Sequence, residues 1–161
     1  MSERVVPVTE LDGYVGQNIS AICPFGFTNE AHGTNHCAHF VAHVLNLSFG
    51  TLCHAHNGAT LRVNEIYNRC GQRGRWDDLP IPLIYCLIFA TQPTNMAHGG
   101  DMMNGPRKHM GIWSDPYVYN YSTMARQVLK EKVPDFQVRL EGVYDADGSN
   151  PVQFFYGYSL P

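Results

Sequence analysis

The spacing of apolar side chains predicts a helix in the first third of the chain. Between residues 35 and 47, Ala38, Val41, Ala42 and Leu45 lie at offsets of 3, 4 and 7. These offsets place apolar side chains on one face of an α-helix, because the helix has about 3.6 residues per turn. The segment is therefore predicted to be an amphipathic helix that packs against a core.

Capping and stop signals define two predicted helices. Thr34 or Asn35 is suited to cap the first helix, since a short polar side chain there accepts a hydrogen bond from a free backbone N–H. Gly50 lies just beyond the end of this helix. A second helix is predicted over residues 59–69, where Gly71 supplies the stop signal.

The second half of the chain changes to the pattern of β-strands. A short helix is still predicted over residues 122–133, with Ser122 or Thr123 as its cap. The turn sequences SDP, at residues 114–116, and DADGSN, at residues 145–150, predict hairpin connections. Runs rich in β-branched and aromatic residues predict strands over residues 81–91, 109–114, 117–122, 136–145 and 150–160.

This order of elements predicts an α+β fold. Residues 1–33 are rich in turn-forming residues and are expected to form an irregular N-terminal segment. Helices follow, and then about five strands joined by short connections. A chain of 161 residues suits one domain. We therefore expect a single domain over residues 1–161, with the helix at residues 35–47 packed on a five- to six-stranded antiparallel sheet.

Composition excludes some classes of partner. Apolar residues make up 44% of the chain, charged residues 16%, and the net charge is −3, so no general basic field attracts nucleic acid. The one basic cluster, residues 69–76, is interpreted as a solvated loop. No apolar run reaches the roughly 18 residues of a membrane span. The N-terminal sequence MSERVVPVTELDG lacks a basic region followed by an apolar stretch, so we expect synthesis in the cytoplasm without a Sec signal.

One of the five cysteines is a candidate nucleophile. Cys86 lies in an apolar run and is expected to be a core thiol, while Cys53 and Cys70 are a possible disulfide pair only in an oxidising compartment. Cys37 lies in the first turn of the helix predicted over residues 35–47. Free N–H groups and the macrodipole make that end of a helix electropositive, which favours the thiolate. We therefore expect a lowered pKa at Cys37.

His109 is the best candidate for the base that such a nucleophile needs. It opens a predicted strand after a glycine-rich loop, and the next predicted strand carries Asn120. Two adjacent antiparallel strands can place Asn120 beside His109, where it would orient the imidazole. The structural alternative is that His109 merely ends a loop and that Asn120 is a surface residue on an edge strand.

The order of these motifs resembles that of papain-like cell-wall peptidases, namely the NlpC-type peptidases and the related CHAP amidases. The resemblance implies a papain-like cysteine hydrolase domain, with Cys37 as nucleophile, His109 as general base and Asn120 as the orienting third residue. It also implies cleavage of an amide bond in the peptide part of peptidoglycan. The pieces that carry the resemblance are NHCAHFV (35–41), HMGIW (109–113) and VYNYS (118–122).

The chain departs from this family at two points near the cysteine. The family commonly has DCSG where this chain has HCAH. The family often has a tyrosine about ten residues upstream that assists the oxyanion, whereas this chain has Phe25 and Phe27 in that region. The expected oxyanion donor is therefore the backbone N–H of Cys37 together with a second group.

The resemblance also implies the partners and the location of the protein. The expected partners are peptidoglycan or its muropeptides, and a cognate immunity protein if the protein is a bacterial toxin. Without a Sec signal, a wall hydrolase leaves the cell by a dedicated secretion route, by lysis or in a phage-like particle. A papain-like hydrolase or acyltransferase acting on another amide or thioester is an alternative that uses the same catalytic residues.

A zinc-binding, non-catalytic structural module is the other alternative. His39 and His43 are four residues apart on one helical face, and such a pair can bind zinc. The chain has neither paired C-x-x-C motifs nor an H-E-x-x-H motif, so no metal and no cofactor are expected. The remaining candidate ligands are Cys53, Cys70 and either His54 or His56.

Overall fold

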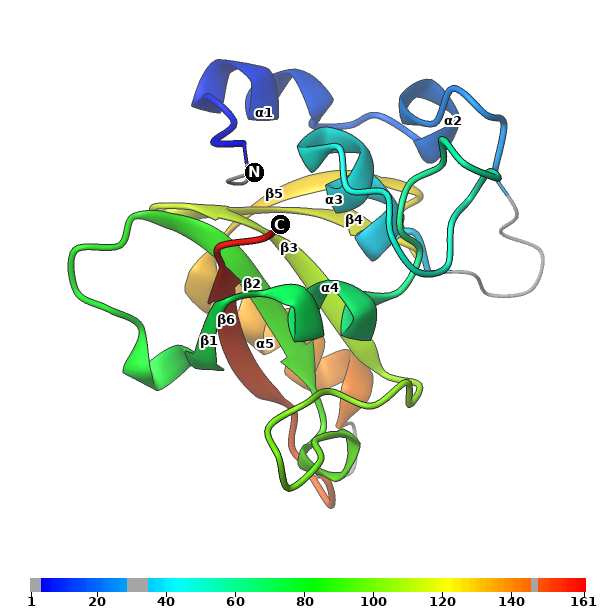
Figure 1. Cartoon of the computed structure of the whole chain (residues 1–161). Helices are drawn as coiled ribbons and strands as arrows, with labels where there is room; N and C mark the ends of the chain where they lie inside the picture. Colours follow the sequence, from blue (N-terminus) through cyan, green and yellow to red (C-terminus); the bar gives the residue numbers. More distant parts are fainter. Residues whose placement is uncertain (1–3, 29–34, 146–147) are drawn as a thin grey trace.

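A computed structural model describes residues 4–28, 35–145 and 148–161 (Figure 1). The helices in these ranges are α1 (Val8–Tyr14), α2 (Ile19–Ile22), α3 (Cys37–Leu45), α4 (Val63–Arg69) and α5 (Val133–Tyr144), with short 3₁₀ turns at Trp76–Asp78 and Pro93–Asn95. The strands are β1 (Gln72–Arg75), β2 (Tyr85–Thr91), β3 (Lys108–Ser114), β4 (Tyr117–Ser122), β5 (Gln127–Lys132) and β6 (Gln153–Tyr158).

The strands form one antiparallel sheet in the order β1-β6-β2-β3-β4-β5. The predicted α+β fold class and antiparallel sheet are therefore confirmed. The central strand β2 is buried on both faces, with Leu87 and Phe89 in one core and Cys86, Ile88 and Ala90 in the other. Burial on both faces explains why this strand is an almost continuous apolar run in the sequence.

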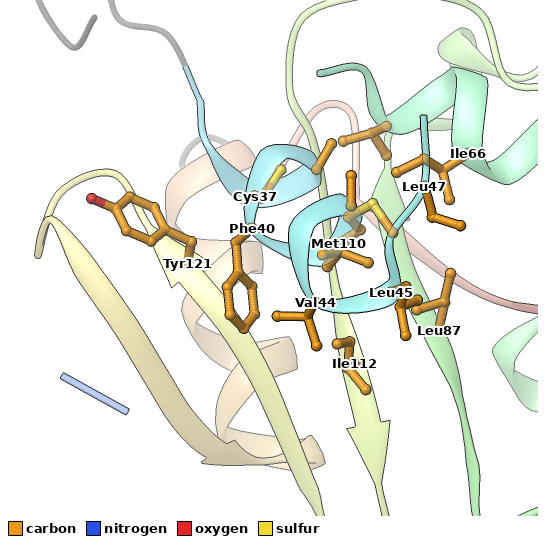
Figure 2. Close-up of a cluster of buried hydrophobic side chains, with 14 of the residues drawn as sticks. Cys37, Phe40, Val44, Leu45, Leu47, Ile66, Leu87, Met110, Ile112 and Tyr121 are labelled. Carbon is orange, nitrogen blue, oxygen red and sulfur yellow. The ribbon is translucent and has the colours of Figure 1, made fainter. Parts of the chain in front are cut away.

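Helices cover both faces of the sheet (Figure 1). Apolar residues of α1 to α4 share the core on one face, and α5 packs on the other. Eight of the nine residues of α3 are buried, and this helix packs on β3 and β4. Figure 2 shows Phe40 and Val44 of α3 among the core side chains that include Met110 and Ile112 of β3.

Two predicted elements have exchanged types. Residues 122–133, predicted as a helix, form a turn and the edge strand β5, and residues 136–145, predicted as a strand, belong to helix α5. Alternating Phe136, Val138 and Leu140 suggested a strand, but the Val138 side chain is 68% exposed. Phe136 and Leu140 are four residues apart and both buried, which is the helical spacing.

The N-terminal segment and the basic cluster are also more ordered than predicted. Helices α1 and α2 lie within residues 1–33, although residues 1–3 and 29–33 lie outside the described ranges. The basic cluster forms β1, which pairs with β6 at the sheet edge. Arg73 lies over the ring of Tyr67, at 5.3 Å from the ring centroid, so this arginine covers an aromatic side chain instead of extending into solvent.

Candidate active site

The candidate site begins where β3 and β4 separate. Their pairing ends at Ile112 and Tyr119, although both strands continue beyond this pair. Asn35, just before α3, connects the separated strands: its Nδ2 donates to the Lys108 carbonyl (3.4 Å), and its Oδ1 accepts from the Thr123 hydroxyl (3.3 Å). The start of α3 therefore closes the space between the two strands.

Cys37 is the first residue of α3, and its own N–H donates to the side-chain Oδ1 of Asn35 (3.0 Å). The cap residue itself is His36, one position later than predicted, and Thr34, the other predicted cap, lies outside the described residues. The backbone N–H of Met110 lies close enough to the sulfur of Cys37 to lower the pKa of the thiol. The sulfur therefore lies against the peptide group that joins His109 to Met110.

Burial controls the charge of the Cys37 thiol. The residue is 1% exposed, and this burial raises the pKa of the thiol to about 11. Backbone N–H groups, chiefly those of Met110 and Ala38, and the positive charge of Lys108 lower the pKa, but they do not offset burial. The lowered pKa expected from the helix N-terminus is therefore wrong for this conformation, in which Cys37 is a neutral thiol.

His109 and Asn120 are in direct contact, as the strand spacing predicted. His109 Nε2 lies 2.8 Å from Asn120 Oδ1, and both residues are buried. The imidazole packs near the Phe136 ring of α5, with 5.9 Å between ring centroids. Burial lowers the pKa of His109 to about 4, so the imidazole is neutral at pH 7.

Two charged residues determine which way the Asn120 amide points. Arg139 Nη2 donates to Asn120 Oδ1 (2.9 Å), and Asn120 Nδ2 donates to Glu131 Oε1 (3.0 Å). A guanidinium can only donate and a carboxylate can only accept, so the oxygen of the amide must face Arg139 and His109. His109 Nε2 is therefore the protonated nitrogen, and its Nδ1 carries the free lone pair.

The same two charged residues stabilise each other. Arg139 donates to Glu131 from Nε (2.9 Å) and Nη2 (2.7 Å). Burial raises the pKa of Glu131, but the hydrogen bonds from Arg139 and Asn120 outweigh burial and hold the pKa below its ordinary value. The carboxylate is therefore ionised at neutral pH and remains an acceptor for the Asn120 amide.

The thiol and the imidazole approach β3 from different sides. Cys37 and Met110 belong to the core beneath α3, whereas the His109 ring contacts Phe136 on the α5 side. Neighbouring strand residues alternate between the two faces, which explains this division. In the described part of the chain no hydrogen bond joins Cys37 Sγ to His109, although the sulfur lies beside the His109–Met110 peptide group.

The site is closed in this conformation. Two surface pockets, of about 670 Å³ and about 370 Å³, lie elsewhere, and neither is lined by Cys37, His109 or Asn120. On the α5 side, the hydroxyl of the half-buried Tyr144 donates to the Lys108 carbonyl (3.2 Å). Burial, and secondarily the negative charge that Cys37 carries as a thiolate, raise the pKa of Tyr144. The Cys37 thiol is therefore not accessible from solvent in this conformation.

Sequence reasoning missed Glu131 and Arg139. They lie on β5 and α5, the two elements whose types the sequence pattern exchanged. Their eight-residue separation matches neither a helical nor a strand contact, so no local signal links them. The pairing of β5 with β4 places Glu131 diagonally across from Asn120, and the packing of α5 on the sheet brings Arg139 to both residues.

A second cluster of reactive side chains lies on the other side of α3. Three of its members, His39, His43 and Cys53, were candidate zinc ligands in the sequence, whereas Cys70 instead donates to the Ile66 carbonyl (3.4 Å). No disulfide links any of the five cysteines. The ligand atoms that lie within 4.8 Å of one another belong to Cys23, His39, His43 and Cys53.

Comparisons with protein-family models, curated proteins and solved structures find no match to this chain. Among the described residues, no helix is both long enough and apolar enough to cross a membrane. The function is therefore argued from the geometry of the site.

Proposed function

We propose that the protein is a cysteine hydrolase that cleaves an amide bond, with Cys37 as nucleophile, His109 as general base and Asn120 as the residue that orients the base. The observation that carries this proposal is the fixed tautomer of His109. Asn120 Oδ1 accepts a hydrogen bond from the Nε2–H of His109, so the lone pair on Nδ1 is the one that can receive a proton.

Acylation proceeds by general-base catalysis from a neutral pair. The proposed step requires a rearrangement that brings Nδ1 of His109 to the Cys37 sulfur. Nδ1 then takes the proton of Cys37 while the sulfur attacks the carbonyl carbon of the amide, and the carbonyl electron pair moves to oxygen. The tetrahedral intermediate then collapses, the C–N bond breaks, and His109 gives the proton to the leaving amine. A thioester remains on Cys37.

Hydrolysis of the thioester uses the same base. Nδ1 of His109 takes a proton from water, the hydroxyl adds to the thioester carbon, and the thiolate leaves and recovers the proton. The negative oxygen of each intermediate requires donors. The backbone N–H of Cys37 is occupied by Asn35 Oδ1, whereas Asn35 Nδ2 makes only a long contact of 3.4 Å. We assign the Asn35 amide as the side-chain donor to the oxyanion.

The proposed substrate is the peptide part of peptidoglycan. This choice is supported by the motif order, which resembles that of the NlpC-type and CHAP enzymes. The proposed partner is therefore peptidoglycan or its muropeptides. The proposal also includes export by a dedicated route and a cognate immunity protein. A papain-like fold for this chain is likewise part of the proposal.

Digestion of purified peptidoglycan tests the proposal directly. The wild-type protein is expected to release fragments with new amino and carboxyl ends, identified by mass spectrometry. Cys37→Ala is expected to lower the release rate by about 10³-fold or more, because no other group forms the thioester. Cys86→Ala is the matched control, since Cys86 is equally buried but lies in the core beneath α5.

The assignment of Cys37 as nucleophile and the assignment of peptidoglycan as substrate are contradicted by different results. Equal release by the wild type and Cys37→Ala would contradict the assignment of the nucleophile. Absence of release by a folded wild type would contradict the peptidoglycan assignment. Thioester capture on Cys37 from other acyl donors would then favour the acyltransferase alternative.

A further inference from the structure

We infer that Cys23, His39, His43 and Cys53 form a zinc site that fastens the N-terminal segment and the loop after α3 to α3 itself. The ligand atoms of all four residues lie within 4.8 Å of one another. Two thiols and two imidazoles are the donor set of many four-coordinate structural zinc sites. This site is separate from the proposed catalytic residues and does not depend on the proposed function.

The four residues come from three separate parts of the chain. His39 and His43 are one helical turn apart on α3, so their side chains lie on the same face. Cys23 is the residue at which the short helix α2 ends, and Cys53 lies in the loop between α3 and α4. This spread explains why the sequence contains no paired zinc-binding motif.

The distances within the cluster approach those of a tetrahedral zinc site. Zinc–nitrogen bonds of about 2.0 Å and zinc–sulfur bonds of about 2.3 Å imply about 3.3 Å between two nitrogen ligands and about 3.8 Å between two sulfur ligands. The Nε2 atoms of His39 and His43 are 3.1 Å apart, and Cys53 Sγ is 3.9 Å from His43 Nε2. A small adjustment of side chains brings all four atoms to bonding distance.

Surrounding residues orient the ligands. The Nδ1 atoms of His36 and His39 are 3.0 Å apart, which leaves Nε2 of His39 facing the cluster. The backbone N–H of Ala59 donates to Cys53 Sγ (3.2 Å), and such a bond stabilises a thiolate ligand. Phe27 packs edge-on against His39, with 5.5 Å between ring centroids, and so shields the cluster from water.

The arrangement is that of a structural site. Four protein ligands complete the coordination of zinc and leave no open position for a substrate. The loop of residues 46–62 contains one isolated β-bridge, between Leu52 and Thr60, as its only strand pairing in the described structure. A metal bound through Cys53 therefore adds a link from this loop to α2 and α3.

Metal analysis of the full chain tests the inference. Protein purified with zinc under reducing conditions is expected to retain one zinc ion per chain. Cobalt(II) in place of zinc is expected to give the visible d–d bands of a tetrahedral site and a thiolate-to-cobalt charge-transfer band. A folded wild type that binds neither metal would overturn the inference, as would a Cys23–Cys53 disulfide formed under the same reducing conditions.

Ligand variants identify the residues that bind the metal. Cys23→Ser and His43→Gln are each expected to weaken zinc binding at least about 100-fold, and Cys23→Ser also weakens the charge-transfer band. The matched controls are Cys86→Ala, a buried cysteine outside the cluster, and His56→Asn, an exposed histidine of the same loop. Unchanged zinc affinity in a folded ligand variant would show that the metal binds elsewhere and would contradict the assignment.

Cys37→Ala separates this inference from the proposed hydrolase activity. Cys37 is not one of the four ligands, so this variant is expected to keep one zinc ion per chain while it loses amide cleavage. Loss of zinc in Cys37→Ala would contradict the four-residue site. Measurement of zinc content and of amide cleavage in this variant therefore tests the zinc site and the hydrolase proposal independently.

Discussion

His109 is neutral in the folded protein because it is buried and lies near the positive charge of Arg139. Its pKa is about 4 in the folded state, compared with 6.5 for an exposed imidazole. As the pH falls below 6.5, the unfolded chain takes up a proton at this position first. Acid therefore favours the unfolded state until the folded state is also protonated near pH 4.

The free energy of unfolding is expected to fall by about 3 kcal/mol between pH 6.5 and pH 4 on account of His109 alone. Urea titrations of the wild type and His109→Gln across this range measure the contribution, because glutamine does not titrate. The two proteins are expected to differ in the slope of stability against pH. Parallel curves would show that the pKa of His109 is the same in the folded and unfolded states and would contradict the lowered pKa.

At the scale of single elements, the sequence predicted the type of element correctly where the spacing of apolar residues fitted only one type. The offsets in α3 fit only a helix, and the continuous run of β2 fits a buried strand; both are present. The segments that became β5 and α5 fit either pattern, and tertiary contacts decided between them. β5 is charged because it is an edge strand, and edge strands carry charges that prevent pairing with other chains.

Gly111 is expected to be required for the close approach of β3 and β4 near the candidate site, because only glycine lacks a Cβ. A Cβ at this position would lie 2.8 Å from the Tyr119 carbonyl oxygen and 2.9 Å from Asn120 Cβ. Gly111→Ala is therefore expected to lower stability by about 1–3 kcal/mol and to reduce amide cleavage by displacing Asn120. Thermal unfolding and peptidoglycan digestion measure the two effects.

Gly142 provides the matched control. It lies in helix α5, and a Cβ there would meet no atom within 4 Å. Gly142→Ala is expected to raise stability by about 0.5–1 kcal/mol, because alanine favours the helix, and to leave cleavage unchanged. Equal effects of the two substitutions would contradict the proposed crowding at Gly111.

At the scale of the whole molecule, the candidate site depends on contacts that no local pattern encodes. The sequence placed Cys37 at a helix start and put Asn120 beside His109, because both features follow from short-range geometry. It did not reveal the raised pKa of Cys37, which results from burial by the whole fold. It also omitted Cys23 from the candidate ligands, since α2 reaches the cluster only through tertiary packing.

Removal of the proposed zinc ion is expected to destabilise α2 and residues 46–62 more than the rest of the molecule. A chelator should increase hydrogen exchange in α2 and in residues 46–62, because the metal is their shared attachment to α3. Exchange in α5 should change little, since this helix packs in the core that contains no ligand residue. Mass spectrometry of proteolytic fragments measures both regions, and a uniform increase would contradict this division.

Helix α3 keeps the thiol of Cys37 apart from the cluster of proposed zinc ligands. Successive residues of a helix are rotated by about 100°, so Cys37 and His39 project about 200° apart. The sulfur of Cys37 meets β3, while His39 meets Cys23 and Cys53. The body of the helix therefore separates the proposed nucleophile from the proposed zinc ion. A zinc ion at the four-residue site would not bind the Cys37 sulfur, because the two lie on opposite sides of the same turn.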